Sequence, residues 1–382
     1  MGENRLRICI VNFPMSKTGS KASLIPILHL LKVLSTFSQD IHIITGNFSV
    51  NLISNEHIGA HILGISHKTR SNALTRVVNY VLTQLKISFK LMKVAKDVDF
   101  YIFFMMGQDL LFPMLAAKSL RKKVVLAFAV SSVRSTEAKN DIFSKPLNLL
   151  SKINCTLANR IILYSPNLIK EWNLEKYRNK ISIAHEHFLD FDKFNVKKKL
   201  SERNNLVGYI GRLSEEKGVL NFVKAIPEAL KERDDLEFLI CGDGQLRDEI
   251  EEYISEKNLN DKVKLAGWIP HGNLPDYLNE LKLVVLPSFT EGLPNIMLEA
   301  MACGTPVLAT PVGAISDVIK DGETGFIMGN NSPECIAENA IRILKQPDLD
   351  KIVENARALV EQEFTYKAVV ERYKKILLEL RG

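Results

Sequence analysis

The sequence between residues 291 and 299 reads Glu-Gly-Leu-Pro-Asn-Ile-Met-Leu-Glu, with a glutamate at each end. A Gly/Pro turn follows Glu291, whereas Glu299 falls inside a predicted short helix. Pro294 suits the first helical position because its missing N–H would be unpaired there in any case. Gly304, which precedes Pro306, predicts a left-handed helix end. The segment therefore predicts a tight turn into a helix, with one carboxylate just before the helix N-terminus and another about one turn inside it.

This pattern suits a ligand that carries both phosphate and sugar. The amides of Asn295 and Ile296 are predicted as free donors at the positive end of the helix, where phosphate binds well. Carboxylates accept hydrogen bonds from sugar hydroxyls. The alternative is an ordinary capped helix with two solvated acids, and a short motif by itself leaves that interpretation open.

A second segment, residues 206–218, reads Leu-Val-Gly-Tyr-Ile-Gly-Arg-Leu-Ser-Glu-Glu-Lys-Gly. An apolar strand runs into Gly211, where the missing side chain lets a ligand approach the backbone. Arg212 follows the strand, and Lys217 is expected to start the next helix. A planar guanidinium and a compact ammonium together suit a diphosphate. The alternative is a surface loop whose charges are solvated.

Three motifs now stand together: Gly-Arg-Leu-x-x-Glu-Lys-Gly at 211–218, Cys-Gly-Asp-Gly at 241–244, and the two-glutamate motif continued by Ala-Met-Ala-Cys-Gly-Thr-Pro-Val to residue 307. In this combination the chain resembles the retaining, nucleotide-sugar-dependent glycosyltransferases of family 4. The resemblance implies the GT-B fold, an α/β architecture of two facing Rossmann-like doubly wound domains with an interdomain cleft. It is dense between residues 205 and 330 and extends less securely over the N-terminal half.

The resemblance also implies roles for individual residues. Arg212 and Lys217 would neutralise the donor diphosphate and stabilise the departing nucleotide, so that no metal and no cofactor is required. Glu291 would contact the transferred sugar, and Glu299 would accept from the ribose hydroxyls. Backbone or close donor contacts are expected at Gly211, Gly242, Gly244, Trp268, Gly292, Leu293, Pro294 and Asn295. The Trp268 backbone would lie near the base, while its ring is equally well interpreted as a core aromatic.

The implied reaction is transfer with retention of anomeric configuration. The leaving phosphate oxygen would take the proton of the acceptor hydroxyl, so positioning and electrostatics would contribute more than a side-chain base. UDP is the expected nucleotide, with GDP and ADP left open. Closure of the two domains would bring donor and acceptor together.

The N-terminal half departs from the family pattern. The loop at 15–21 contains a single glycine, Gly19, as a candidate for a close phosphate or acceptor contact. Ala129 stands where many relatives have a histidine beside the donor sugar. Asp109 and Glu137 are candidate acceptor-side carboxylates, although solvated loop acids are the favoured interpretation. The pair His185 and His187 is expected to pack or hydrogen-bond at a hinge, since two ligands are too few for a metal.

Length and patterning predict two domains, because 382 residues exceed a single core. Apolar runs alternate with helical patterns, which predicts parallel, doubly wound sheets. We expect an N-terminal acceptor domain at 1–190, a C-terminal nucleotide-sugar domain at 191–365, and a final helix at 366–382 that packs back on the N-terminal domain. The polar stretch at 190–205 has the composition of a linker.

Charge differs between the halves. Residues 1–190 carry 25 Lys+Arg and 12 Asp+Glu, a net of +13, so the total of +6 leaves −7 for residues 191–382. The basic segment 68–96 has no acidic residue and carries apolar residues at helical spacing between Leu74 and Leu85. Such a helix is typical of contact with an anionic membrane surface. The alternative is a domain helix whose apolar stripe packs on its sheet and whose lysines are solvated.

These observations predict a hexosyltransferase that acts on a lipid-linked or cell-surface glycan in polysaccharide biosynthesis. We expect a cytoplasmic protein, with peripheral attachment to the inner membrane face left open, because neither a signal peptide nor a membrane-spanning run is recognised. Nucleic acid is not an expected partner, since no recognition motif occurs. The alternatives are a non-catalytic scaffold subunit with the same fold and a nucleotide-sugar epimerase.

Overall fold

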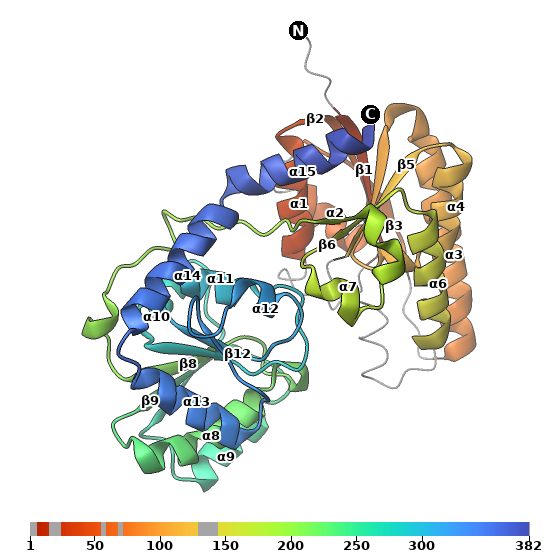
Figure 1. Cartoon of the computed structure of the whole chain (residues 1–382). Helices are drawn as coiled ribbons and strands as arrows, with labels where there is room; N and C mark the ends of the chain where they lie inside the picture. The colour runs from red at the N-terminus through yellow and green to blue at the C-terminus, as the bar shows by residue number, and fades with distance from the viewer. Residues whose placement is uncertain (1–5, 15–23, 55–58, 68–71, 129–143, 382) are drawn as a thin grey trace. The chain divides into compact units, whose positions relative to one another are not determined.

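The computed structural model describes residues 6–14, 24–54, 59–67, 72–128 and 144–381. Its contacts divide the chain into two compact units: unit 1 comprises Met1–His187 with Lys367–Gly382, and unit 2 comprises Phe188–Tyr366. Each unit contains one parallel sheet covered by helices (Figure 1). The predicted α/β class, with two Rossmann-like doubly wound sheets, is therefore confirmed.

Unit 1 contains a seven-stranded sheet in the order β3-β2-β1-β4-β5-β6-β7, with all neighbours parallel. Its strands are β1 Leu6–Asn12, β2 Ser38–Gly46, β3 His61–Ile65, β4 Phe100–Phe104, β5 Lys123–Phe128, β6 Arg160–Leu163 and β7 Ile181–Ile183. The central strands are apolar throughout because both of their faces are covered. In the edge strand β3 only the last residue, Ile65, is buried.

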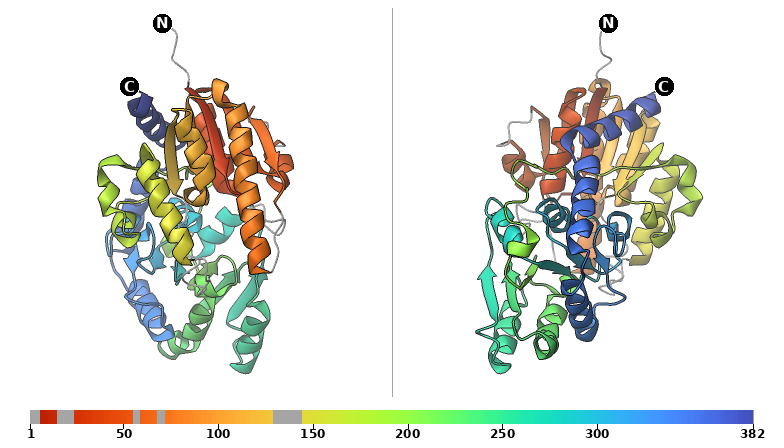
Figure 2. Two further views of the ribbon diagram at one scale, coloured as in Figure 1. Left: turned by 90° about the vertical axis from the view of Figure 1, so that its right-hand side faces the viewer. Right: turned by 60° about the vertical axis from the view of Figure 1, so that its left-hand side comes forward.

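Helices lie on both faces of this sheet, with α1 and α15 on one face and α3, α4 and α6 on the other (Figures 1 and 2). The helices of unit 1 are α1 Ile25–Ser35, α2 Asn47–Ser54, α3 Ala73–Lys93, α4 Leu111–Ser119, α6 Ser144–Leu157, α7 Asn167–Glu171 and α15 Tyr366–Arg381. Short 3-10 turns occur at η2 Ala95–Asp97, η3 Gly107–Asp109 and η4 Glu175–Lys180. Helix α15 covers the residues for which a C-terminal helix was expected.

Helix α3 exposes most of its apolar side chains, for example Leu74 at 71% and Leu85 at 51%. Its buried side is mixed: Thr83, Gln84 and Ser88 are buried together with Ile87 and Leu91. The inward polar groups have partners: the Phe112 amide donates to Gln84 Oε1 at 3.0 Å, and Ser88 Oγ donates to the Gln84 carbonyl at 2.9 Å. The interpretation that the apolar stripe packs on the sheet is therefore wrong.

Unit 2 contains a six-stranded parallel sheet in the order β10-β9-β8-β11-β12-β13. Its strands are β8 Leu206–Ile210, β9 Glu237–Cys241, β10 Val263–Gly267, β11 Leu283–Leu286, β12 Val307–Ala309 and β13 Phe326–Ile327. The helices are α8 Val219–Glu232, α9 Arg247–Glu256, α10 Leu274–Glu280, α11 Asn295–Ala302, α12 Ile315–Val318, α13 Pro333–Leu344 and α14 Leu349–Glu363, with turns η5 Leu200–Glu202 and η6 Glu215–Lys217. Apolar residues of α8, α9 and α13 pack with the sheet into one core.

The polar stretch before β8 is not a free linker. Arg203 is only 3% exposed, and its guanidinium donates to the carbonyls of Lys198, Leu278, Leu281 and Cys303 and to Thr305 Oγ1. Burial lowers the pKa of Arg203 to about 10, so the side chain stays charged at neutral pH. The linker interpretation is wrong here because the charge of Arg203 serves hydrogen bonds inside unit 2.

Candidate active site

Every predicted donor-site residue of unit 2 lies at the carboxyl edge of its sheet. Gly211 follows β8, Gly242 follows β9, Trp268 follows β10, and Glu291 lies in the loop after β11. The strands β10, β9, β8 and β11 are neighbours in that order. Ligands of open parallel sheets bind at this edge. The topology therefore brings together segments that are about 80 residues apart in the sequence.

The loops after β8 and β9 are joined backbone to backbone. The Gly211 amide donates to the Cys241 carbonyl at 3.0 Å, and the Leu213 amide donates to the Asp243 carbonyl at 3.0 Å. A Cβ at Gly242, which has a φ of +138°, would lie 1.8 Å from the Gly211 carbonyl oxygen; a Cβ at Gly244 would lie 2.3 Å from the Leu213 carbonyl oxygen. The absence of side chains at these two glycines is thus required by loop packing, independently of any ligand.

The loop after β8 is also tied to the loop after β11. The Phe289 amide donates to the Glu216 carbonyl at 2.9 Å, and a Cβ at Gly218, whose φ is +66°, would lie 2.0 Å from the Pro287 carbonyl oxygen. Lys217 ends the turn η6, and α8 begins only at Val219. The prediction that Lys217 starts the helix is therefore wrong, because the left-handed Gly218 separates the turn from the helix.

Lys217 and Glu291 form a direct ion pair. Lys217 Nζ donates to Glu291 Oε1 at 2.7 Å, with 24% and 9% of the two side chains exposed. Ser288 Oγ donates to the same oxygen at 2.8 Å. Among the described residues none donates to Glu291 Oε2. The sequence indicated a separate role for each residue, and the structure adds that the two charges hold each other in place.

Arg212 is the more exposed of the two cations, since 68% of its side chain is open to solvent. Its Nη1 lies 3.1 Å from Glu216 Oε1. Burial acts to raise the pKa of Glu216, but a backbone hydrogen bond and the charges of Arg212 and Lys217 hold the pKa below its usual value. Glu216 is therefore ionised at neutral pH and tethers Arg212 beside the Lys217 turn.

Helix α11 presents its N-terminus in the same loop. Pro294 has a φ of −73° and an extended ψ of 120°, which makes it the N-cap, and the helix begins at Asn295. Its prediction as the first helical residue is wrong by one position, since the fixed φ of proline fits either place. Of the described residues, none accepts from the amides of Asn295 or Ile296. Gly304 has a φ of +66°, which confirms the predicted left-handed end.

Glu299 has a partner that sequence reasoning missed. His271 Nε2 lies 2.7 Å from Glu299 Oε1, and the glutamate side chain is only 8% exposed, compared with 59% for the histidine. Lys193 Nζ lies 3.4 Å from His271 Nδ1, so the histidine connects two charged groups. The feature of the sequence that could have indicated this role is position: His271 lies three residues after Trp268, the residue predicted to contact the base.

Other predicted site residues have plainer environments. Trp268 is 72% exposed, so its interpretation as a core aromatic is wrong: it stands beyond the end of the edge strand β10. Leu293 is buried, and the Gly292 carbonyl accepts from the Ala314 amide at 2.8 Å. Asp109 is 1% exposed, which contradicts its interpretation as a solvated acid, because η3 packs against β4, β5 and α6. Tyr80 Oη of α3 donates to the Asp109 carbonyl at 2.5 Å. Gly19, Ala129 and Glu137 lie outside the described residues.

The two histidines of unit 1 are packed, as predicted, around a buried carboxyl group. His185 and His187 are each 7% exposed, and their rings lie 5.9 Å apart. Between them Glu186 is completely buried and accepts from Tyr164 Oη. Burial raises the pKa of Glu186 to about 7 against the lowering effect of that hydrogen bond, and burial lowers the pKa of His187 to about 3.

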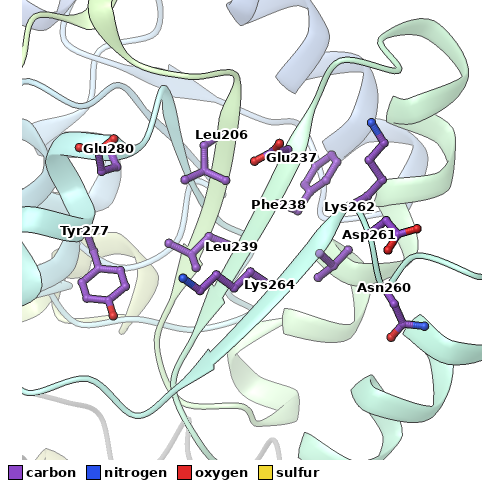
Figure 3. Close-up of a pocket in the computed structure, with 11 residues that line it drawn as sticks. Leu206, Glu237, Phe238, Leu239, Asn260, Asp261, Lys262, Lys264, Tyr277 and Glu280 are labelled. Carbon is purple, nitrogen blue, oxygen red and sulfur yellow. The ribbon is translucent and has the colours of Figure 1, made fainter.

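A pocket of about 360 Å³ lies elsewhere in unit 2. Figure 3 shows Tyr277 and Glu280 of α10 opposite side chains from the starts of β8, β9 and β10, including Leu206, Glu237 and Lys264. These are the amino ends of the strands, whereas the predicted donor site is at their carboxyl ends. No residue of the predicted site lines this pocket.

The comparisons with known proteins agree with this geometry. Residues 190–359 match the family model described as glycosyl transferases group 1. This chain therefore carries a domain of the glycosyl transferases group 1 family, which spans most of unit 2. The family prediction is confirmed at this level, and membership in family 4 stays a prediction.

Among curated relatives, alpha-D-kanosaminyltransferase from Streptomyces kanamyceticus is 31% identical over 204 residues, which cover 52% of this chain and 53% of that protein. The chain thus spans about half the length of the curated relatives it matches. Crystal structures of Anabaena HepE superpose on nearly the whole chain at 18% identity. The complex with UDP has a TM-score of 0.76 and the complex with UDP-glucose 0.72, each covering 97% of this chain and 99% of HepE. This likeness confirms the predicted GT-B fold.

Proposed function

We propose that the protein is a retaining glycosyltransferase of family 4 that moves a hexose from a nucleotide-diphosphate sugar to a lipid-linked or cell-surface glycan. The observation that carries this proposal is the Lys217–Glu291 pair at 2.7 Å beside the unpaired N-terminus of α11. It combines a cation and helix amides for phosphate with a carboxylate for the sugar. The group 1 family match supports the reaction class.

In the proposed donor complex the diphosphate lies against Arg212, Lys217 and the amides of Asn295 and Ile296. These groups stabilise the charge that develops on the leaving phosphate, so we propose that the reaction needs no metal. Glu291 remains held by Lys217 and Ser288 through Oε1, and its Oε2 accepts from a hydroxyl of the transferred sugar. Glu299 exchanges His271 for the ribose hydroxyls of the nucleotide.

UDP is the proposed nucleotide. One observation supports it: HepE, which shares the fold, has been crystallised with UDP and with UDP-glucose. Trp268 at the same sheet edge leaves its ring exposed for a base of any kind. Retention follows in this proposal from front-side attack, in which the leaving phosphate oxygen takes the acceptor proton. The glycosidase alternative needs a carboxylate pair flanking the reacting bond, whereas both motif glutamates are assigned to the donor.

The experiment that tests the proposal is thermal-shift binding of UDP-, GDP- and ADP-sugars, with and without EDTA. We expect one nucleotide class, UDP, to raise the melting temperature by mass action, with no effect of EDTA and with loss of the shift in Lys217→Ala. The surface variant Lys231→Ala, whose lysine pairs with Glu228 on the same helix α8, is the matched control.

The alternatives give different results. A scaffold subunit would bind no nucleotide sugar, and an EDTA-sensitive shift would contradict the metal-independent site. An epimerase would convert its donor without an acceptor, which product analysis by NMR detects. Retention itself is read from the anomeric configuration of the glycosidic bond that is formed.

A further inference from the structure

The helix layer of unit 1 exposes an unusual amount of apolar surface. Six apolar side chains follow one another along the outer side of α3 with helical spacing, and all are between 48% and 71% exposed: Leu74, Val78, Leu82, Leu85, Phe89 and Met92. We name this row the outer stripe. Isolated exposed apolar residues are ordinary, but contiguous patches mark interaction surfaces.

The neighbouring helices continue this surface. Helices α3, α4 and α6 lie side by side on one face of the sheet (Figure 2, left). On α4, Phe112 is 36% and Leu115 is 47% exposed; on α6, Leu149 is 61% exposed. The patch thus spans three helices, and we call it the outer face of unit 1.

The charges of these helices have a single sign. The sequences of α3, α4 and α6 contain no aspartate or glutamate. Their cations are four in α3 (Arg76, Lys86, Lys90, Lys93), one in α4 (Lys118) and two in α6 (Lys145, Lys152). Lys93 Nζ lies 4.7 Å from the centre of the Phe89 ring, and the exposed Lys145 and Lys152 lie one turn on either side of Leu149. Lysines therefore flank the apolar residues.

We infer that the outer face of unit 1 docks on an anionic lipid bilayer. Apolar side chains flanked by lysines fit the boundary between acyl chains and acidic headgroups, where lysine stems lie along apolar groups and their ammoniums reach the headgroups. A second copy of the chain fits poorly, because two such faces would bring like charges together. Among the described residues no helix has the length and apolar composition to cross a bilayer, so the contact is with the surface.

The orientation of α3 supports this inference. A helix that only covered its sheet would place most of its apolar residues inward, whereas α3 buries Ile87 and Leu91 beside the hydrogen-bonded Gln84 and Ser88 and leaves the six residues of the outer stripe to solvent. Lys90 Nζ donates to the Gly64 carbonyl at 2.6 Å, and Lys86 Nζ to Ser66 Oγ at 3.2 Å. These bonds fix how α3 is rotated about its axis, so the stripe is held outward.

This inference deepens the proposed function, in which the acceptor is lipid-linked. The role of docking rests on that proposed function. Docking would hold the enzyme at the surface where such an acceptor is embedded. Binding to lipid is measurable without donor or acceptor, so the two proposals fail separately. A protein that binds UDP-sugar but no vesicles would overturn only the docking inference, and the converse result would overturn only the transferase.

The test is co-sedimentation of the full chain with vesicles of phosphatidylcholine alone or of phosphatidylcholine mixed with phosphatidylglycerol. We expect binding to the anionic vesicles only, weakened by salt because the attraction is partly electrostatic. Leu82→Ser with Phe89→Ser should reduce the affinity about tenfold or more. Each of Lys145→Gln and Lys152→Gln should reduce it about fivefold.

The matched control is Leu378→Ser, which removes a 42% exposed leucine from α15 on the other face of the unit 1 sheet. It should leave vesicle binding unchanged. Unaltered circular dichroism and melting temperature in every variant exclude misfolding as the cause of a loss. The inference is overturned if the natural chain does not sediment with anionic vesicles at low salt, or if the stripe and control variants behave alike. A dimer that the stripe variant dissociates, without vesicle binding, would assign the face to a second copy instead.

Discussion

Helices α3 and α8 are both amphipathic, yet the two units use them in opposite ways. In α8 the buried side chains are all apolar: Val219, Phe222, Val223, Ala225, Ile226 and Ala229. In α3 the buried set mixes Ile87 and Leu91 with Thr83, Gln84 and Ser88, while three leucines and Phe89 are exposed. Periodicity predicts that a helix has two faces but not which of them is inside. In α3 the hydrogen bond of the inward Gln84 contributes to that choice together with the burial of Ile87 and Leu91.

The largest expected difference between the helices concerns two phenylalanines. Phe222 of α8 is 1% exposed and packs with Tyr209 and Phe238 at ring distances of 6.0 and 6.2 Å. Phe222→Ala should cost about 3–5 kcal/mol of unfolding free energy through the cavity it leaves. Phe89→Ala on α3 should cost no more than about 1 kcal/mol, because Phe89 is 56% exposed. Urea unfolding and hydrogen exchange of the two helices measure both; equal costs would contradict the orientation of α3.

The second prediction concerns the charges that follow the strands of unit 2. Lys217→Ala should lower kcat/KM for sugar transfer about 10²–10³-fold, because it removes a cation from the leaving phosphate and releases Glu291. Steady-state kinetics with UDP-sugar provide the measurement, and Lys231→Ala should match the natural enzyme. A loss below tenfold would show that the diphosphate is held elsewhere.

The third prediction turns to the buried carboxyl group of unit 1. Folding raises the pKa of Glu186 from 4.5 to about 7, so between these values the folded state binds more protons than the unfolded state. Its contribution to stability is complete below about pH 4.5 and is lost as the pH rises through about 7. Glu186→Gln should remove this pH dependence, which is on the order of 3 kcal/mol.

Urea unfolding of the natural chain and of Glu186→Gln from pH 4.5 to 8 gives the difference between their unfolding free energies as a function of pH. The buried histidines change the stability in the opposite direction, because their contribution to the unfolding free energy increases as the pH rises and the unfolded chain loses its protons. This contribution is common to both chains and cancels in the difference. A difference curve that does not change with pH would contradict the raised pKa of Glu186.

The smallest expected effect concerns the inward face of α3. Gln84→Leu removes the acceptor of the Phe112 amide and should cost about 1–3 kcal/mol, although leucine is the more apolar residue. Thermal and urea unfolding measure this change in unfolding free energy. Leu85→Gln, on the exposed face of α3, is the reverse exchange and serves as the comparison. If Gln84→Leu instead raised the free energy of unfolding, the hydrogen bond from the Phe112 amide to Gln84 would not stabilise the fold.

Much of the fold was readable from local sequence. Central strands such as β8 and β11 are continuous apolar runs that end in glycine or proline, and their bounds follow from that contrast. The edge strands β3 and β13 are harder to read from the sequence because both are short: β3 has five residues with Gly64 among its apolar ones, and β13 has two. Arg203 was placed in a linker, since composition does not distinguish a solvated charge from one that serves five buried acceptors.

The predicted donor-site residues come from motifs whose spacing reflects local geometry: a glycine at a strand end, a cation in the following turn, and a helix N-terminus after a Gly/Pro turn. The sequence did not show which of these residues pair with each other. Lys217 meets Glu291 across 74 positions, and His271 meets Glu299 across 28, because parallel strand order brings their loops to one edge.

The sequence by itself determined the α/β class, the helix at α3, the motif residues after β8 and β11, and the basic character of the first half, since these depend on residue type and short-range spacing. Only the tertiary structure decided which charges pair, which carboxyl groups are buried and which side of α3 is exposed. The physical reason is that pairing and burial depend on contacts between distant segments, and a helix can be rotated about its axis without any change in its periodicity.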